Sequence, residues 1–366
     1  MKEKKTKAKT KIMNIRSKQF LTGAEVVVQA AIDAGATMMY GYPITPGTEI
    51  LTGWIRRAEN SNGQLRYLQT EDEIAAGFAV CGAVMAGEKA FTATAGPGTT
   101  LMQDGMSMAD GMRLPFVAIV VQRGGPSSGT VIYSQQEVNL AIHGGNGEGL
   151  RVVYSPSNLA ELYEHTRLAF NNAWKYKFPA VVLSDGFLMK TRQTVDLNFD
   201  IEDVEPEATV SEKTQKNIRN IYSFEEELGS KLAIDSKGFQ IMAGDVARSE
   251  SYCGNDCRLQ IAECRIDKFV IAHGIVAGAA KMAVDELQKM GRKVGLFRPI
   301  TLSPFPKKEL NEALRQAQGK KIFIVESSLG QLRDLVKQNL EVDVEVDGLY
   351  KPAEGIEAEE IVKLLT

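Results

Sequence analysis

Helix and strand patterns alternate along residues 19–195, and this alternation constrains the fold more than any other feature of the sequence. Apolar strands such as "ATMMYGYP" and "PFVAIVVQ" are separated by helical stretches, as in a parallel sheet covered by helices on both faces. A second alternation of the same kind begins at "KFVIAHG" and continues toward the C-terminus. The sequence therefore predicts two α/β domains, each built on a parallel sheet.

The predicted boundaries divide the chain into four segments. Residues 1–18 form a Lys-rich basic tail, which we expect to be disordered. Residues 19–195 form the first and larger domain, and residues 237–366 form the second. Between them, residues 196–236 are acidic and show no sustained period, so we expect a linker or an irregular crossing.

The composition excludes several classes of protein. The formal net charge is -3 and the apolar runs are short, so we expect neither a nucleic-acid partner nor a membrane span. Four cysteines do not make a disulfide scaffold in a chain of 366 residues, which favours a cytoplasmic location. Cys253, Cys257 and Cys264 lie close together, but their spacing matches no standard zinc or iron–sulfur pattern. We therefore predict no metal site in this chain, and the role of these cysteines stays open.

The stretch "GYPITPG" follows the first strand of this alternation and contains two prolines around an Ile-Thr step. Pro46 suits the first position of a helix, where its missing N–H costs nothing, and this makes Thr45 the predicted N-cap. The alternative is functional, because open α/β sheets bind ligands where a helix starts after the carboxyl end of a strand. Both interpretations of the Thr45 hydroxyl are open at this point.

The stretch "QTEDEIAAGFAVCGA" places Glu73 at the start of a helix made largely of small residues. Thr70 and Glu73 have the spacing of a capping box, which would give the carboxylate a purely structural role. A helix of Ala, Gly and Val is also expected to be buried, and burial raises the pKa of a carboxyl group. Glu73 is therefore also a candidate for a carboxyl group that holds its proton and donates a hydrogen bond.

A glycine-rich turn in "TATAGPGTTLMQDG" places Gly96, Pro97 and Gly98 where a strand turns into a helix. The dinucleotide-binding fingerprint needs a third glycine where this chain has Leu101, and the lysine of a P-loop is absent. Neither a Rossmann coenzyme nor a P-loop nucleotide is supported. What remains is a tight turn that gives close approach of the backbone.

Arg123 stands immediately after a predicted buried strand, in "VVQRGGPSSGT", and two glycines follow it. A guanidinium group suits bidentate capture of a carboxylate or a phosphate. The alternative is an ion pair between strands, since arginine is rarely buried without a partner. The residues alone do not decide between these interpretations.

Five motifs, taken in order, strongly resemble the alpha subunit of 2-oxoacid:ferredoxin oxidoreductases, the group acting on 2-oxoglutarate, branched-chain 2-oxoacids or pyruvate. They are "GYPITPGTEI", "QTEDEIAAGFAVCGA", "TATAGPGTTLMQDG", "VVQRGGPSSGT" and "HGGNGEG". The likeness continues through "LSPFPKKEL" and "IFIVESSLGQL" in the second domain. It implies a thiamine diphosphate-binding domain of the pyrimidine type, followed by a smaller α/β domain like the C-terminal domain of transketolase.

The resemblance also implies roles for individual residues. Glu73 would be catalytic, hydrogen-bonding N1′ of the aminopyrimidine and promoting formation of the reactive ylide. Thr45 and Arg123 would bind the carboxylate of the substrate. The residues that would bind the cofactor are Pro43, Ile44, Thr45, Glu73, Gly96 and Pro97.

Motifs that are missing imply a partner. Thiamine enzymes hold the diphosphate through a metal bound by a Gly-Asp-Gly stretch and a downstream Asn, and no such stretch occurs here. An iron–sulfur cysteine pattern is also missing. The resemblance therefore implies that thiamine diphosphate is shared with a beta subunit, which carries the diphosphate site, Mg²⁺ and a [4Fe-4S] cluster. It leaves room for gamma and delta subunits.

The predicted reaction is the CoA-dependent oxidative decarboxylation of a 2-oxoacid to an acyl-CoA and CO2, with electrons passed to ferredoxin. We expect 2-oxoglutarate as substrate, with a branched-chain 2-oxoacid or pyruvate as alternatives. Gly47 and Asn146 depart from residues common in the family near the expected pocket, so the substrate stays open. Two other functions also stay open: a non-redox thiamine diphosphate transferase subunit, as in transketolase, and a non-catalytic α/β binding protein.

Overall fold

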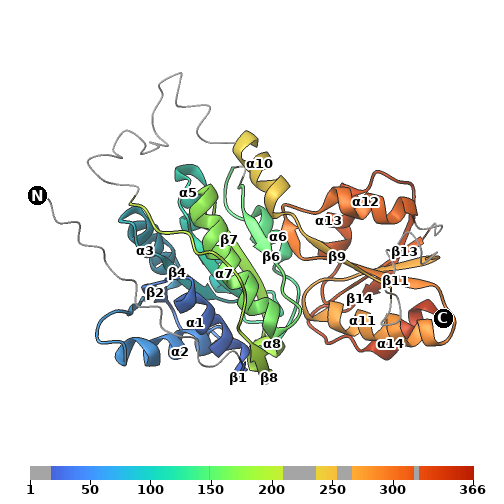
Figure 1. The fold of residues 1–366 in the computed structure, drawn as a ribbon, viewed down its shortest axis with the longest axis horizontal. Coiled ribbons are helices and arrows are strands. Elements are labelled where there is room, and N and C mark those ends of the chain that lie inside the picture. The colour runs from blue at the N-terminus through green and yellow to red at the C-terminus, as the bar shows by residue number, and fades with distance from the viewer. Residues whose placement is uncertain (1–17, 148, 209–235, 254–265, 317–320) are drawn as a thin grey trace, which may run out of the picture.

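The structure, a computed structural model, describes residues 18–147, 149–208, 236–253, 266–316 and 321–366. The chain folds around two sheets, one of seven strands and one of five, which lie on the left and right of Figure 1. Among the described residues, every helix is too short or too polar to span a bilayer. The predicted basic tail lies outside the described residues, apart from Lys18.

The larger sheet is parallel over six strands, in the order β6-β7-β5-β4-β2-β3. β4, β5, β6 and β7 are buried along their whole length, because helices cover both of their faces. β3 is the exposed edge. The six strands are β2 (Met38–Gly41), β3 (Arg66–Gln69), β4 (Ala90–Thr94), β5 (Val117–Gln122), β6 (Val152–Tyr154) and β7 (Ala180–Asp185).

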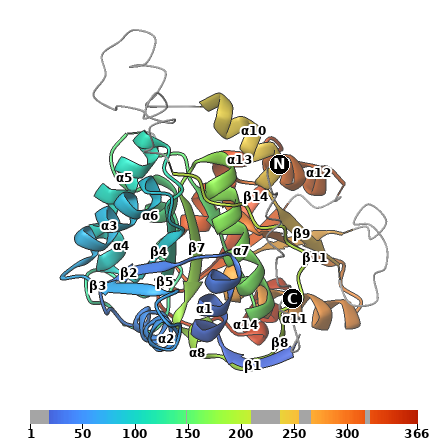
Figure 2. The same cartoon turned by 60° about the vertical axis from the view of Figure 1, so that its left-hand side comes forward.

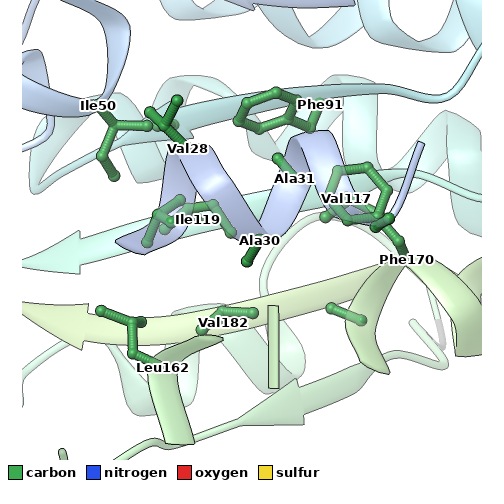
Figure 3. Packing of buried hydrophobic residues seen from close by; sticks show 14 of the residues in the cluster. Val28, Ala30, Ala31, Ile50, Phe91, Val117, Ile119, Leu162, Phe170 and Val182 are labelled. Atoms are coloured by element: carbon green, nitrogen blue, oxygen red, sulfur yellow. The ribbon is translucent and has the colours of Figure 1, made fainter. Parts of the chain in front are cut away.

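Alternate residues of each buried strand face two different helical layers. Val117, Ile119 and Val121 of β5 share a core with α1, α2 and α7, whereas Ala118 and Val120 share a core with α3, α5 and α6. Figure 3 shows the first of these cores, in which side chains of α1 lie between the strands and neighbouring helices. The helices are α1 (Gly23–Asp33), α2 (Thr48–Glu59), α3 (Glu73–Met85), α5 (Gln103–Met112), α6 (Val138–His143) and α7 (Leu159–Tyr176).

The two ends of the first predicted domain meet in a small antiparallel pair. β1 (Lys18–Thr22) pairs with β8 (Arg192–Asp196), which follows the short helix α8 (Gly186–Lys190). α1 then begins with a capping box: Thr22 Oγ1 accepts from Glu25 N at 3.2 Å, and Glu25 Oε2 accepts from Thr22 N at 2.8 Å.

The smaller sheet has the order β14-β13-β10-β11-β9. Four of its strands are parallel, as the sequence predicts, but β9 runs antiparallel to β11, so the prediction of an all-parallel sheet is wrong at this edge. β9 has the sequence "SESY", which carries no apolar alternation and therefore no strand signal. The strands are β9 (Ser249–Tyr252), β10 (Lys268–Ile271), β11 (Val294–Pro299), β13 (Lys321–Glu326) and β14 (Glu345–Tyr350).

A continuous core joins the two sheets. Leu310 of α12 and Leu332 of α13 belong to the same buried cluster as Met106 of α5 and Val138 of α6. The strand β12, which follows β11 in the chain, leaves the smaller sheet and pairs antiparallel with β6 of the larger one. The strand β12 spans Thr301–Ser303. On the smaller sheet, the helices α11 (Gly274–Lys289) and α14 (Ala358–Leu365) cover one face, and α12 (Lys307–Gln316) and α13 (Gln331–Asn339) cover the other.

The described part of the predicted acidic linker, residues 197–208, crosses the first domain without forming a helix or a strand. Arg167 of α7 holds it through an ion pair of 2.8 Å with Asp203. Farther along the chain, α10 (Ser236–Val246) also lies on the first domain, where Met242 is buried in the core of α1 and α7. This helix follows the predicted linker in the chain but packs beside the larger sheet. The predicted domain limits stay a prediction.

Candidate active site

Four neighbouring strands of the larger sheet end at the same edge, and a predicted site residue follows each end. In the order β5-β4-β2-β3, the strands lead into Arg123, Gly96, the turn at 43–47 and Glu73. Figure 2 shows β2 and β3 at the outer side of the sheet, with α2 and α3 on opposite sides of them. Because open α/β sheets bind ligands at the carboxyl ends of strands, this edge is the candidate active site.

Glu73 is the first residue of α3, but it does not cap that helix. The capping box predicted for Thr70 and Glu73 is wrong, because the N-cap is Asp72, whose Oδ1 accepts from Ala75 N at 2.7 Å. The Asp72 side chain, which is one carbon shorter than that of Glu73, accepts from the free backbone N–H of Ala75 in the first turn of the helix. This is the usual geometry of an N-cap. Thr70 instead donates from Oγ1 to Asp72 O at 2.8 Å. The Glu73 carboxyl group is therefore free of the structural role that its spacing suggests.

The Glu73 carboxyl group is buried without using its full hydrogen-bonding capacity. The residue is 5% exposed, and its Oε1 has no hydrogen-bond partner among the described residues. Burial is the largest cause that raises the pKa of Glu73, and the neighbouring Asp72 charge raises it further. A buried acceptor without a donor costs stability. The presence of one where ligands bind, at the carboxyl ends of the strands, therefore points to a ligand.

Gly98 makes room for this carboxyl group. A Cβ atom at position 98 would lie 2.3 Å from Glu73 Oε1 and 2.2 Å from Thr94 Oγ1, which has no described partner either. Only glycine permits this approach of α4 (Pro97–Leu101) to the start of α3. The glycine-rich turn thus gives close approach of the backbone, and what it approaches is Glu73.

The Thr45 hydroxyl is not a helix cap either. α2 begins at Thr48, its N-cap is Gly47, and no side chain caps it. A turn precedes the helix, in which Thr48 N donates to Ile44 O at 2.9 Å. The helix therefore starts two residues later than Pro46 suggests, and the predicted N-cap is wrong. The Thr45 side chain is exposed at the sheet edge.

Arg123 lies against the Thr45 turn and is 6% exposed. Its Nη1 donates to Thr45 O at 2.8 Å, while its Nε has no hydrogen-bond partner among the described residues. Gly96, with a φ of +54°, lies beside the guanidinium, and a Cβ there would be 2.5 Å from Arg123 Nε. The predicted alternative, an ion pair, does not occur within the described ranges. There, the buried arginines with ion pairs are Arg151, Arg167 and Arg298.

Glu137 is a residue of this site that the sequence analysis missed. Its Oε1 accepts from Gly96 N at 2.8 Å and from Arg123 N at 3.2 Å, and its Oε2 accepts from Thr99 Oγ1 at 2.6 Å. Burial raises the pKa of Glu137 to about 7, against these hydrogen bonds, which lower it. One signal was available, because Glu137 is the only acidic residue between Arg123 and His143.

The remaining predicted residues lie at the same edge. Ile44 packs against the core, Pro43 is exposed in the same turn, and Pro97 opens α4. Contacts thus join Thr45, Arg123 and Gly96 directly. The roles predicted for these residues are not tested by their positions and stay predictions.

One of the clustered cysteines, Cys253, is buried just after β9. Cys257 and Cys264 lie outside the described residues. Within the described part of the chain, no three His, Cys, Asp or Glu side chains form a group that could hold a metal ion.

Two family matches cover most of the chain. Residues 29–245 match the family described as pyruvate flavodoxin/ferredoxin oxidoreductase, thiamine diphosphate-binding. The chain belongs to this family. Residues 266–358 match pyruvate:ferredoxin oxidoreductase core domain II. The predicted family and the predicted α/β fold with a thiamine diphosphate-binding domain are confirmed.

Curated relatives of this oxidoreductase are similar along most of their length. The ketoisovalerate oxidoreductase subunit VorB of Methanothermobacter marburgensis is 33% identical over 326 residues, which cover 87% of this chain and 89% of the relative. The 2-oxoglutarate synthase subunit KorA of Methanocaldococcus jannaschii is 31% identical over 338 residues, with 86% and 89% covered. The predicted enzyme class is therefore confirmed: the chain is an oxidoreductase that acts as one subunit of a complex.

Solved structures agree with this fold. A 2-oxoglutarate:ferredoxin oxidoreductase from Magnetococcus marinus, with 2-oxoglutarate, coenzyme A and succinyl-CoA bound, matches at a TM-score of 0.82 and 26% identity. The match covers 95% of this chain and 65% of that chain. A split-gene transketolase, an inactive β4 tetramer, matches at a TM-score of 0.55 and 13% identity, which shows the likeness of the fold alone.

Proposed function

We propose that this chain is the alpha subunit of a 2-oxoacid:ferredoxin oxidoreductase. With its partners it converts a 2-oxoacid and CoA to an acyl-CoA and CO2, and the electrons released pass to ferredoxin. Support comes from relatives named as oxidoreductases of ketoisovalerate and as 2-oxoglutarate synthases. The solved relative with 2-oxoglutarate, coenzyme A and succinyl-CoA bound also supports this reaction.

The observation that carries the proposal is the unpartnered carboxyl oxygen of Glu73. A ring nitrogen of the thiamine pyrimidine fits this position, because Glu73 Oε1 offers a buried hydrogen-bonding group and Gly98 keeps the space beside it free. Since burial raises the pKa of Glu73, the carboxyl group can hold a proton and share it with that nitrogen. When bound, thiamine diphosphate supplies the carbanion chemistry that releases CO2 from a 2-oxoacid. The other residues proposed to line the cofactor are Pro43, Ile44, Thr45, Gly96 and Pro97.

We also propose that Arg123 binds the carboxylate of the 2-oxoacid, together with the Thr45 hydroxyl. Arg123 is buried, its Nε has no partner in the described part of the chain, and its Nη1 is fixed by the Thr45 carbonyl. A guanidinium held in one orientation binds a carboxylate with little reorganisation. The exposed Thr45 side chain belongs to the same turn and can donate a second hydrogen bond.

2-Oxoglutarate is the substrate that we propose, with a branched-chain 2-oxoacid or pyruvate as alternatives. The curated relatives include enzymes named for both of the first two classes at nearly equal identity. 2-Oxoglutarate has a second carboxylate, which requires a further cationic or hydrogen-bonding group. A branched-chain 2-oxoacid would instead need an apolar pocket.

The proposal includes partners, since the relatives are named as subunits. A beta subunit would carry the diphosphate site, Mg²⁺ and a [4Fe-4S] cluster, and gamma or delta subunits would complete some assemblies. Thiamine diphosphate would then be held between two chains, with Glu73 on this side. We propose a cytoplasmic location for the complex.

The test uses the complex purified with its partner subunits. A panel of 2-oxoglutarate, ketoisovalerate and pyruvate is offered with CoA and a low-potential dye as electron acceptor. We expect CoA-dependent dye reduction with at least one 2-oxoacid, fastest with 2-oxoglutarate, and its loss in Glu73→Gln. Transfer of a two-carbon unit between sugars without dye reduction would favour the transketolase-like alternative and contradict the proposal.

A further inference from the structure

The motif "IFIVESSLGQL" in the second domain has no role in the site described so far. It lies against the segment between β5 and α6, which begins with Arg123 and ends with Glu137. We infer that the second domain positions Arg123 by holding the far end of this segment, with Gln135 and Gln331 as positioning residues. The inference rests on the proposed role of Arg123 in binding the substrate carboxylate.

Gln135 makes the first set of contacts. It is 1% exposed, and both ends of its side-chain amide are bonded to backbone groups of the second domain. Its Nε2 donates to His273 O at 2.8 Å, and its Oε1 accepts from Ser327 N at 3.0 Å. The Gln135 backbone N donates to Ser327 O at 3.0 Å as well. Because one neighbour is a carbonyl and the other an N–H, the amide has a single satisfied orientation.

Gln331, the first residue of α13, makes the second set. Its Nε2 donates to Gln136 O at 2.7 Å, and its Oε1 accepts from Asn139 N at 2.9 Å. These two backbone groups lie on either side of Glu137 in the sequence. Together with Gln135, they fix the chain before and after Glu137 from the second domain.

Glu137 then connects this anchored backbone to the substrate-binding arginine. Its carboxylate accepts from the backbone N of Arg123 and of Gly96, and from the Thr99 hydroxyl. Glu137 is only 5% exposed, so water cannot replace these donors without a free-energy cost. A displacement of Glu137 would therefore move the Arg123 backbone and the Gly96 turn together.

The two ends of the segment between β5 and α6 are joined to each other, so a displacement of one end moves the other. Gly125 N donates to Gln136 Oε1 at 2.9 Å, which joins the two ends of the segment. Gly124, next to Arg123, also meets the second domain, since a Cβ there would lie 2.5 Å from Ala353 Cβ. The second domain thus contacts the segment at both ends.

The experiment compares Gln331→Ala with Ser303→Ala in the complex with partner subunits. Ser303 Oγ donates to Arg151 O at 2.7 Å, so Ser303→Ala removes a second-domain hydrogen bond of similar length away from Arg123. We expect Gln331→Ala to raise the KM for the 2-oxoacid about tenfold, leaving the KM for CoA unchanged, because the substrate arginine is misplaced. Gln331→Glu keeps the acceptor for Asn139 N but places a second carboxylate oxygen against the Gln136 carbonyl, so it should raise this KM as well. Ser303→Ala should leave both KM values unchanged.

Amide hydrogen exchange provides a second measurement, which does not depend on activity. Exchange over residues 124–139 should be faster in Gln331→Ala than in Ser303→Ala or the wild type. Equal exchange in the two variants overturns the inference. The inference is also overturned if Gln331→Ala shows faster exchange but an unchanged KM for the 2-oxoacid, while Arg123→Lys raises that KM. If Arg123→Lys leaves the KM unchanged, the proposed role of Arg123 fails, whereas the exchange comparison still tests the contact between the domains.

Discussion

Two buried glutamates at the same sheet edge differ in how the fold uses them. Glu73 and Glu137 are each 5% exposed, and burial raises the pKa of both. Glu137 accepts from three donors of its own chain, whereas Glu73 Oε1 accepts from none among the described residues. A carboxyl group that the chain satisfies is explained by the fold, but one that it leaves unsatisfied needs a ligand to explain it.

The largest effect that this comparison predicts is on catalysis at Glu73. Glu73→Gln keeps the shape of the side chain but replaces the carboxyl group, so we expect kcat to fall by about 10²- to 10⁴-fold. The melting temperature should not decrease, since no hydrogen bond of Glu73 Oε1 within the described chain is lost. Both quantities are measured on the complex. Retained activity, or a collapse of stability, would show that Glu73 is a structural carboxylate like Glu137.

The next effect comes from the space that Gly98 leaves beside Glu73. In Gly98→Ala, a methyl group 2.3 Å from Glu73 Oε1 must displace the carboxyl group, and we expect a loss of kcat/KM of about a hundredfold. Gly82 in the same helix as Glu73 offers a control, because a Cβ there meets no atom within 4 Å. Gly82→Ala should keep full activity and raise stability by about 0.5–1 kcal/mol. Equal losses of kcat/KM in Gly98→Ala and Gly82→Ala would mean that replacing a helical glycine is itself harmful. The loss at position 98 would then not come from displacing the Glu73 carboxyl group.

A smaller effect is expected at Arg123. Arg123→Lys replaces a planar fork by a point charge, so we expect the KM for the 2-oxoacid to rise about ten- to fiftyfold. The affinity of the complex for thiamine diphosphate, measured by calorimetry, should change little, because Glu73 and Gly98 are untouched. A matched loss in cofactor affinity would place Arg123 at the cofactor instead of the substrate.

Local patterns were sufficient for most of the fold. Alternation of apolar strands with helical stretches predicted the parallel strands of both sheets. β12 was not predicted because it is a three-residue strand whose partner, β6, lies far away in the sequence. Pairing of this kind depends on how the domains pack together, which a local period does not contain.

In the site, as in the fold, features that depend on the local sequence were predictable, and features that depend on contacts between distant residues were not. The small-residue helix after Glu73 correctly indicated burial, because composition is a local property. The two predicted caps, at Thr45 and Thr70, are wrong because a turn and a competing Asp72 decide where the helices begin. Glu137 was missed since its role arises from contacts with Gly96, Thr99 and Arg123, distant in sequence from it.

The last effect concerns stability and not activity: it is a pH dependence caused by Glu137. The ordinary pKa of 4.5 would apply in the unfolded chain, while burial raises the pKa to about 7 in the folded one. Between these two values the folded state binds more protons than the unfolded state, so the free energy of unfolding decreases as pH rises. Below pH 4.5 Glu137 is protonated in both the folded and the unfolded state, so it does not change the free energy of unfolding with pH.

Glu137→Gln removes this titration and keeps the hydrogen bonds. Its amide oxygen can accept from Gly96 N and Arg123 N, and its amide N–H can donate to the Thr99 hydroxyl. The variant should therefore gain stability relative to the wild type, by up to about 3 kcal/mol, as pH rises from 4.5 to about 7. Chemical denaturation of both proteins across this range measures the gain. A constant difference would mean that the three donors hold Glu137 ionised throughout, and the contrast with Glu73 would then lie in charge as well as in hydrogen bonding.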